Sequence, residues 1–287
     1  MSAEIYAGVE LGGTKCVAML ASGPERILAR ETVPTTTPQE TLERLSDTLA
    51  SWESEGFHAL GIGSFGPLDL EAGTIASTPK PGWRGAEVKR WLSEAVRTPT
   101  AFDTDVNGAA LAEMRWGSGR DMQDFAYVTV GTGVGVGLIV NGKPTRGFAH
   151  CELGHIRVAR LAGDTFAGSC PYHGDCVEGL AAGPSLKGRV GDRVSELSEE
   201  DPLWHSVAWA LAQLCHAIVC AAAPRAIAIG GGVIEKQPHL LPRIEQMLID
   251  SLNGYVDLPG PGYVRPPALG SEAGPLGAIA LAMTAAR

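Results

Sequence analysis

The apolar positions in the first part of the chain form short runs that are separated by glycine turns. Residues 5–11 make one such run, which stops at Gly12-Gly13, and two further runs follow at 16–20 and 27–33. Apolar runs of this length between turn residues are typical of buried strands. This order predicts a meander of three strands joined by tight turns.

Apolar residues then recur three or four positions apart between residues 38 and 55. This spacing predicts a helix, and Thr37 stands where a cap is expected. The same criteria predict further helices at 87–96, 106–116, 183–190, 202–222, 240–252 and 277–285. Further strands are expected at 59–64, 100–102 and 226–229, with a short extended piece at 74–77.

A second meander begins halfway along the chain. The apolar run 125–130 turns at Gly131-Thr132-Gly133 and resumes at 134–140, before an Asn-Gly hairpin signal. One layout, a strand, a Gly/Thr turn and a strand, therefore opens each half. We predict an α/β protein of two domains.

The predicted boundary lies in a polar, glycine-containing stretch at 116–124. The expected domains are 1–118 and 119–275, and the C-terminal helix 276–287 is expected to complete the first of them. The apolar stretch 203–223 is interrupted by polar residues and predicts a buried helix rather than a membrane span.

Composition narrows the class of function. The 287 residues are 45% hydrophobic and 19% charged, as in a soluble globular protein, and the net charge of −9 lacks the basic footprint of a nucleic-acid binder. Any anionic ligand must then be held by local backbone amides or by a metal ion. The acidic N-terminal stretch does not resemble a signal peptide, so we expect a cytoplasmic protein without disulfides.

A cluster of metal-ligand residue types follows the second meander. Cys170, His173 and Cys176 are separated by two residues each, and Pro171 and Gly174 are turn formers. Two thiolates and two imidazoles form a closed, structural zinc set. The alternative is that the cysteines are buried thiols and the histidine is a surface residue.

The fourth ligand of this predicted zinc site is left open by the sequence. His155 is the first choice, and His150 and Cys151 are close rivals. Glu152 and Glu178 stand at the two ends of the loop, where carboxylates could face a polar small molecule.

The glycine turns suggest a phosphate ligand. Residues 10–15 lack the spacing of a Walker loop, and 131–137 lack that of the dinucleotide fingerprint. A strand follows each turn, so both are predicted to be hairpins that offer backbone N–H groups and a threonine hydroxyl to phosphate oxygens. Each turn alone could be an ordinary tight turn, but the pair and a third turn at 230–232 favour the phosphate role.

Five segments resemble the motifs of sugar kinases of the ROK family, within the actin-like ATPase superfamily, and they follow one another in the order expected for that family. The segments are 10–15, 131–133, 152–155, 170–178 and 230–232. The resemblance implies two actin-like, ribonuclease H-like domains with a ligand cleft between them. It also implies a homodimer, MgATP as the phosphate donor and a hexose as the acceptor.

Three departures from the common family pattern point to one branch. Glu10 replaces the usual aspartate, His173 replaces a cysteine, and Thr104-Asp105 replaces an Asn-Asp pair. Together with the run 78–83 they resemble the bacterial zinc-containing fructokinases. The implied reaction is phosphorylation of D-fructose at its 6-hydroxyl. A glucokinase, mannokinase or N-acetylhexosamine kinase is the alternative, and a non-enzymatic sugar sensor is a further one.

The resemblance implies that Asp105 is the general base for this hydroxyl. The residues support it independently, because Asp105 precedes an apolar-periodic helix whose dipole favours an ionised carboxylate. A plain helix cap is the competing interpretation. The residues expected to contact the sugar are Gly66, Trp83, Thr104, Asp105, Glu152, His155 and Glu178.

The ATP contacts implied by the resemblance are Gly12, Gly13, Thr14, Gly131, Thr132, Gly133, Gly183, Pro184, Gly231 and Gly232. Glu10 is expected near the magnesium ion of MgATP, directly or through water. Lys15 is interpreted as a solvated surface residue. Trp83 is about as well explained by a place in the core as by a platform for the sugar ring.

Overall fold

The computed structural model describes residues 4–286, so Arg287 of the predicted C-terminal segment and the first three residues of the predicted first domain lie outside it. The chain forms two compact units. Unit 1 contains residues 4–121, 144–150 and 271–286, and unit 2 contains residues 122–143 and 151–270. Unit 1 thus includes the segment 144–150, which the predicted boundaries give to the second domain.

Unit 1 is built on a five-stranded sheet of order β3-β2-β1-β4-β7. The predicted meander is confirmed as β1 (Tyr6–Leu11), β2 (Lys15–Gly23) and β3 (Arg26–Pro34), which pair antiparallel. The remaining strands, β4 (Leu60–Ser64) and β7 (Thr100–Thr104), extend the sheet parallel to β1.

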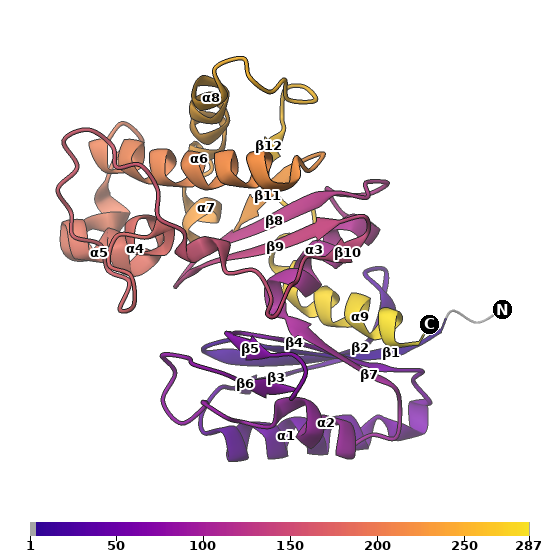
Figure 1. Ribbon diagram of the computed structural model, residues 1–287. Coiled ribbons are helices and arrows are strands. Elements are labelled where there is room, and N and C mark those ends of the chain that lie inside the picture. The colour runs from indigo at the N-terminus through magenta and orange to yellow at the C-terminus, as the bar shows by residue number, and fades with distance from the viewer. Residues whose placement is uncertain (1–3, 287) are drawn as a thin grey trace. The chain divides into compact units, whose positions relative to one another are not determined.

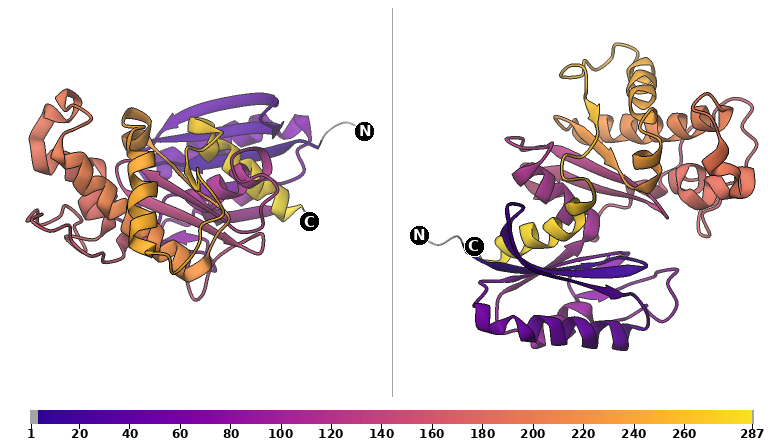
Figure 2. Two further views of the ribbon diagram at one scale, coloured as in Figure 1. Left: turned by 90° about the horizontal axis from the view of Figure 1, so that it is seen from above. Right: turned by 180° about the vertical axis from the view of Figure 1, so that it is seen from behind.

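Helices cover both faces of this sheet. One face carries α1 (Pro38–Ser51) and α2 (Val88–Glu94), and the other carries α9 (Ala273–Ala285) with α3 (Asp105–Trp116) packed beside it (Figure 1). Figure 2 shows the same layers of unit 1 from behind. Thr37 caps α1 through Glu40 N, as predicted, but α1 ends at Ser51 and a short 3-10 turn, η1 (Glu53–Glu55), follows.

Small residues let α9 approach the sheet. A Cβ on Gly61 would lie 1.9 Å from the carbonyl oxygen of Ala278, and one on Gly8 would lie 2.9 Å from its side chain. Backbone of α9 therefore packs directly on β1 and β4 at positions where only glycine fits. This close packing fixes the N-terminal end of α9 near the end of β1.

Unit 2 holds a second five-stranded sheet, of order β10-β9-β8-β11-β12. The predicted second meander is confirmed as an antiparallel pair, and β11 lies parallel to β8. The strands are β8 (Phe125–Val130), β9 (Val134–Val140), β10 (Lys143–Pro144), β11 (Ile227–Gly230) and β12 (Val264–Arg265). The helices are α4 (Val177–Ala181), α5 (Gly183–Val190), α6 (Pro202–Ala222), α7 (Gly232–Lys236) and α8 (Leu240–Leu252).

The smaller elements are β5 (Leu68–Asp69) and β6 (Thr74–Ile75) in unit 1, and η2 (Leu153–His155) and η3 (Gly191–Glu196) in unit 2, with η4 (Gly270–Glu272) before α9. Within the described residues, α6 is the one helix whose length and composition would allow it to cross a membrane. It packs against α4 and α8, and its buried side chains, Trp204, Leu211 and Ile218 among them, belong to the core of unit 2.

Candidate functional site

In unit 1, the predicted residues gather where three parallel strands end. The register pairs Leu11 of β1 with Ser64 of β4, and Ser64 with Thr104 of β7. The first glycine turn, Gly66 and Asp105 follow these three strand ends. Ligands of parallel α/β sheets bind at this edge. Unit 1 therefore brings together the first glycine turn and the candidate base.

The capping role at the start of α3 belongs to Thr104 and not to Asp105. The hydroxyl of Thr104 accepts a hydrogen bond from Asn107 N at 3.1 Å, and this side chain is buried. Thr104 is therefore a helix cap, and its expected contact with the sugar stays a prediction. Asp105 is the first helical residue, and its Oδ1 accepts from Val106 N at 2.8 Å.

A hydrogen-bond network around the buried carboxylate of Asp103 was not predicted from the sequence. Asp103 is 2% exposed, accepts a hydrogen bond from Asn107 Nδ2 at 2.8 Å, and pairs with the guanidinium of Arg146. Nearby, His150 Nε2 accepts from Leu68 N at 2.8 Å. His150 is thereby engaged with the backbone that follows Gly66. The signal in the sequence was an aspartate directly after Phe102, at the end of a predicted strand.

The first glycine turn is tight and carries a nearby cation. Gly12 N donates to Lys15 O at 3.1 Å, and a Cβ on Gly12 would lie 2.5 Å from that oxygen. A Cβ on Gly13 would meet nothing within 4 Å. Lys80 donates from Nζ to Gly13 O at 2.6 Å, a contact that the sequence analysis did not predict. The side chain of Lys15 is exposed, as expected.

Glu10 lies just before this turn. Burial raises the pKa of its carboxyl to about 7, and the charges of Lys15 and Arg30 only partly oppose this. A Cβ on Gly274 would lie 1.9 Å from Glu10 Oε1, so the carboxyl group fits against the first turn of α9 only because residue 274 is glycine. A poorly solvated carboxyl at this edge is a candidate cation ligand.

Trp83 is a core residue. Its ring is 0% exposed, stacks edge-on with Phe65 at 5.3 Å, and donates from Nε1 to Thr36 O at 3.0 Å. It therefore offers no exposed ring face, contrary to the expectation that it forms a platform for the sugar.

Unit 2 gathers the remaining predicted ATP residues at one edge of its sheet. Gly131 follows β8 and Gly231 follows β11, and Gly183 N donates to Gly131 O at 2.8 Å. Gly231 has φ +88°, and a Cβ there would lie 2.7 Å from Val130 N. Thr132 is exposed, so its hydroxyl is available to a ligand.

The four residues predicted to bind a metal converge. Their ligand atoms all lie within 4.8 Å of one another. The Nδ1 atoms of His155 and His173 are 3.3 Å apart, and Cys170 Sγ is 3.7 Å from each. Cys176 Sγ is 3.6 Å from His155 Nδ1. The group is a candidate metal-binding cluster, and His155 is its fourth member.

Glu178 connects this cluster with the second glycine turn. Its Oε2 accepts from Val134 N at 3.1 Å and lies 4.0 Å from His155 Nε2. A Cβ on Gly133 would lie 2.6 Å from the same oxygen, and one on Gly154 would lie 1.8 Å from Val134 O. One carboxylate oxygen of Glu178 thus accepts a hydrogen bond from the protein backbone. Glu152, at the other end of the loop, is exposed.

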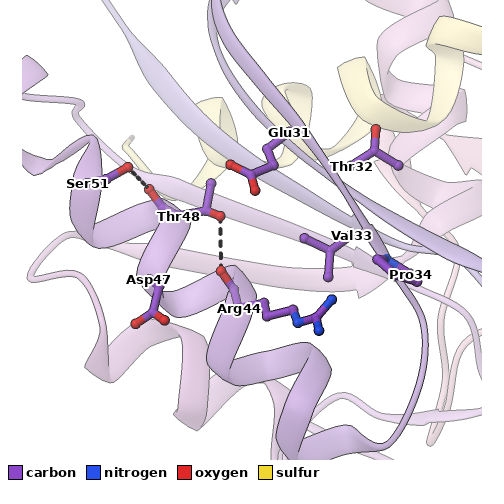
Figure 3. A pocket seen from close by; sticks show the side chains of 8 residues that line it. All are labelled: Glu31, Thr32, Val33, Pro34, Arg44, Asp47, Thr48 and Ser51. Carbon is purple, nitrogen blue, oxygen red and sulfur yellow. Dashed lines mark hydrogen bonds between the residues drawn. The ribbon is translucent and has the colours of Figure 1, made fainter.

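A separate cavity of about 380 Å³ lies between β3 and α1 (Figure 3). Its polar wall includes Arg44, Thr48 and Ser51, and Thr48 donates to the carbonyl oxygen of Arg44. None of the sequence-predicted site residues line it. The cavity is therefore not part of the candidate site.

Comparison with known proteins places the chain. The fructokinase of Lactococcus lactis subsp. cremoris is 41% identical over 260 residues, covering 88% of this chain and 87% of that protein. A putative fructokinase of Bacillus subtilis strain 168 is 38% identical over 285 residues, covering 96% of this chain and 94% of that protein. The crystal structure of the ROK hexokinase from Thermus thermophilus superposes with a TM-score of 0.81 at 30% identity, covering 98% of each chain.

The predicted fold class and family are both confirmed. The α/β units have the fold of the actin-like ATPases, as in the solved ROK sugar kinases. The family model described as "ROK family" matches residues 6–285. This chain therefore belongs to the ROK family.

Proposed function

We propose that this chain is an ATP-dependent fructokinase that transfers the γ-phosphoryl group of ATP to the 6-hydroxyl of D-fructose. The observation that carries phosphoryl transfer is the placement of Asp105 and the first glycine turn at the ends of neighbouring parallel strands. The choice of fructose is supported by the two relatives named fructokinase, which align over 88% and 96% of the chain.

Asp105 is proposed as the general base. As the sugar oxygen bonds to the γ-phosphorus, the bond from that phosphorus to the β–γ bridging oxygen breaks, and ADP leaves. The hydroxyl proton passes to the carboxylate of Asp105. A positioned base of this kind contributes about 10²–10⁴-fold to the rate. Because Thr104 supplies the helix cap, the carboxylate of Asp105 is not needed for that purpose.

Sugar hydroxyls are proposed to bind the backbone of Gly66 and the side chains of Glu152, His155 and Glu178. Oε2 of Glu178 is bonded to Val134 N, so Oε1 is the atom we assign to the sugar. Unpaired polar groups penalise analogues that lack the matching hydroxyl, which gives such a site its selectivity. ATP phosphates are assigned to Gly12, Gly13, Thr14, Gly131, Thr132 and Gly133, and the nucleoside to Gly183, Pro184, Gly231 and Gly232.

The Cys/His cluster is proposed to hold zinc as a structural ion. Zinc bonds of about 2.0–2.1 Å to nitrogen and about 2.3 Å to sulfur give tetrahedral separations of about 3.4 Å for N–N and about 3.6 Å for N–S. The separations in the structure, 3.3 Å and 3.6–3.7 Å, fit these values. With four protein ligands the ion keeps no open position, so it supplies stability rather than chemistry.

Glu10 is proposed to lie near the magnesium ion of MgATP, which neutralises phosphate charge during transfer. Its carboxyl, with a pKa raised to about 7 by burial, ionises more readily beside a cation. We also infer a cytoplasmic homodimer, on the basis of the resemblance to sugar kinases.

The proposal is tested by steady-state assays of the purified protein with fructose, glucose, mannose and N-acetylhexosamines. We expect the highest kcat/KM with fructose. Asp105→Asn should lower kcat by about 10²–10⁴-fold without changing the melting temperature. Asp47→Asn, at an exposed position on α1, is the matched control. A clear preference for another hexose would refute the substrate assignment, and an active Asp105→Asn variant would refute the base.

A further inference from the structure

The first glycine turn of unit 1 is contacted by a lysine side chain from a distant part of the chain. Lys80 lies 67 residues away in the chain, and its Nζ donates to Gly13 O at 2.6 Å. Lys15, which belongs to the turn, is exposed instead. The tertiary fold thus brings a distant ammonium group to the backbone where phosphate oxygens are proposed to bind.

The loop that carries Lys80 is rigid for local reasons. Trp83 N donates to Lys80 O at 3.4 Å, Pro81 restricts the backbone φ angle at the second residue of the turn, and Gly82 at the third residue has φ +79°. These are the features of a type II turn. Trp83 is fully buried and anchors the turn to Thr36 O. The Lys80 backbone is therefore held in place before any ligand binds, which reduces the entropy lost on binding.

The charge of Lys80 is not neutralised by the protein. Among residues 4–286, Lys80 has no ion pair with a carboxylate, and its side-chain hydrogen bond is the one to Gly13 O. An ammonium group has three donors, so two remain. The space over Gly13 is also open, since a Cβ there would meet nothing within 4 Å. In a chain with a net charge of −9, such a local cation is needed to attract an anion.

We propose that Lys80 is a phosphate-binding residue that donates its two remaining N–H groups to the terminal phosphate oxygens of the nucleotide. This inference rests on the proposed function, because it assigns a further role within the same reaction. Bonds from an ammonium to phosphate are charge-assisted and stronger than bonds between neutral groups. Lys80 stabilises the negative charge on the phosphoryl group as it transfers, and Gly13 O keeps the ammonium oriented.

Two substitutions separate this role from simple support of the loop. Lys80→Met removes both the donors and the charge, whereas Lys80→Gln removes the charge but keeps an amide N–H donor on a side chain one bond shorter. Arg84→Met is the control, because Arg84 is an exposed cation of the same loop. We expect both Lys80 variants to lower kcat by about 10²–10³-fold, as loss of a transition-state donor does. Arg84→Met should match the wild type.

Calorimetric titration with ATP and with adenosine provides a readout that a structural role would not affect. Both Lys80 variants should lose affinity for ATP and keep their affinity for adenosine, with unchanged melting temperatures. The proposal is overturned if Lys80→Gln behaves as the wild type in kcat and in ATP affinity, or if ATP and adenosine affinities fall together. A wild-type protein inactive on every hexose would refute the proposed function, whereas the comparison of ATP with adenosine would still decide the role of Lys80.

Discussion

The two Gly/Thr turns share a scaffold but differ in what surrounds them. The first joins β1 to β2 in unit 1, and the second joins β8 to β9 in unit 2, each between antiparallel strands. At the first, Lys80 donates from Nζ to Gly13 O, and Thr35 donates from Oγ1 to Gly12 O. At the second, the carboxylate of Glu178 accepts from Val134 N.

The two turns also differ in how closely other side chains pack against their glycines. The space over Gly13 is open, whereas a Cβ on Gly133, the last residue of the second turn, would lie 2.6 Å from the Glu178 carboxylate. Glu178 in turn lies 4.0 Å from His155 Nε2, and His155 belongs to the metal cluster. The turn itself depends on local residues, but its chemistry depends on loops that reach it from elsewhere in the chain. The following experiments test this contrast.

Removal of the metal should have the largest effect and should be confined to unit 2. Structural zinc contributes about 10–16 kcal/mol of apparent binding free energy in small domains. Chelation, or Cys176→Ser, is therefore expected to lower the melting temperature by more than about 10 °C, roughly the shift for 3 kcal/mol or more. Hydrogen exchange followed by mass spectrometry should show faster exchange at 151–180 and at Val134, while β1 and β4 stay protected.

The control for this experiment is Cys220→Ser, because Cys220 is exposed and lies outside the cluster. Metal analysis of the freshly purified protein should find about one zinc per chain. Protein without bound metal, or unchanged exchange at the second turn after chelation, would contradict the proposed support.

Alanine substitutions at Gly13 and Gly133 should destabilise the protein only at Gly133. Gly133→Ala pushes the Glu178 carboxylate from Val134 N, and the loss of that bond is expected to cost about 1–3 kcal/mol. Gly13→Ala should change the unfolding free energy by less than about 0.5 kcal/mol, because its Cβ meets nothing. Urea unfolding measures both, and equal destabilisation by the two changes would argue against the contrast.

The smallest expected effect concerns Glu10, beside the first turn. Its pKa is raised from 4.5 to about 7 in the fold, so the folded state binds the proton more tightly than the unfolded state. The stabilisation from protonated Glu10 is complete below about pH 4.5 and is lost as the pH rises through about 7. Glu10→Gln should therefore melt at a progressively higher temperature than the wild type between about pH 5 and pH 8, by a few degrees at most.

This comparison is made on protein without nucleotide or magnesium, and thermal melting across the pH range measures it. Glu31→Gln, at an exposed position on β3, controls for the loss of a carboxylate. A difference between Glu10→Gln and the wild type that stays constant with pH would rule out the burial of this carboxyl as its cause.

The long elements were predictable from sequence, and several of the short ones were not. Both β1 and α6 match their predicted ranges closely, because their apolar periodicity is continuous, whereas β2 extends to Gly23 and β3 is mostly exposed. The elements β12 (Val264–Arg265) and α7 (Gly232–Lys236) were missed. Elements as short as these two offer too little apolar periodicity to detect, and neighbouring strands and loops stabilise them.

The same limit applies to the candidate site. The spacing of Cys170, His173 and Cys176 was enough to predict a metal cluster, since ligands three residues apart can reach one ion. Arg146 and Lys80 were missed because they act on residues 43 and 67 positions away. No local pattern marks a side chain whose partner is that distant.

The sequence by itself determined the strands, the glycine turns and the metal-ligand residue types, because these follow from local periodicity, φ preferences and ligand chemistry. Only the tertiary structure decided that His155, rather than His150, completes the cluster, since the ring of His150 is engaged by Leu68 N. It likewise decided that Trp83 is buried while Lys80 reaches the first glycine turn. These outcomes depend on which segments of the chain come into contact. The contacts form only in the folded protein, because apolar burial and hydrogen bonding must be satisfied at the same time.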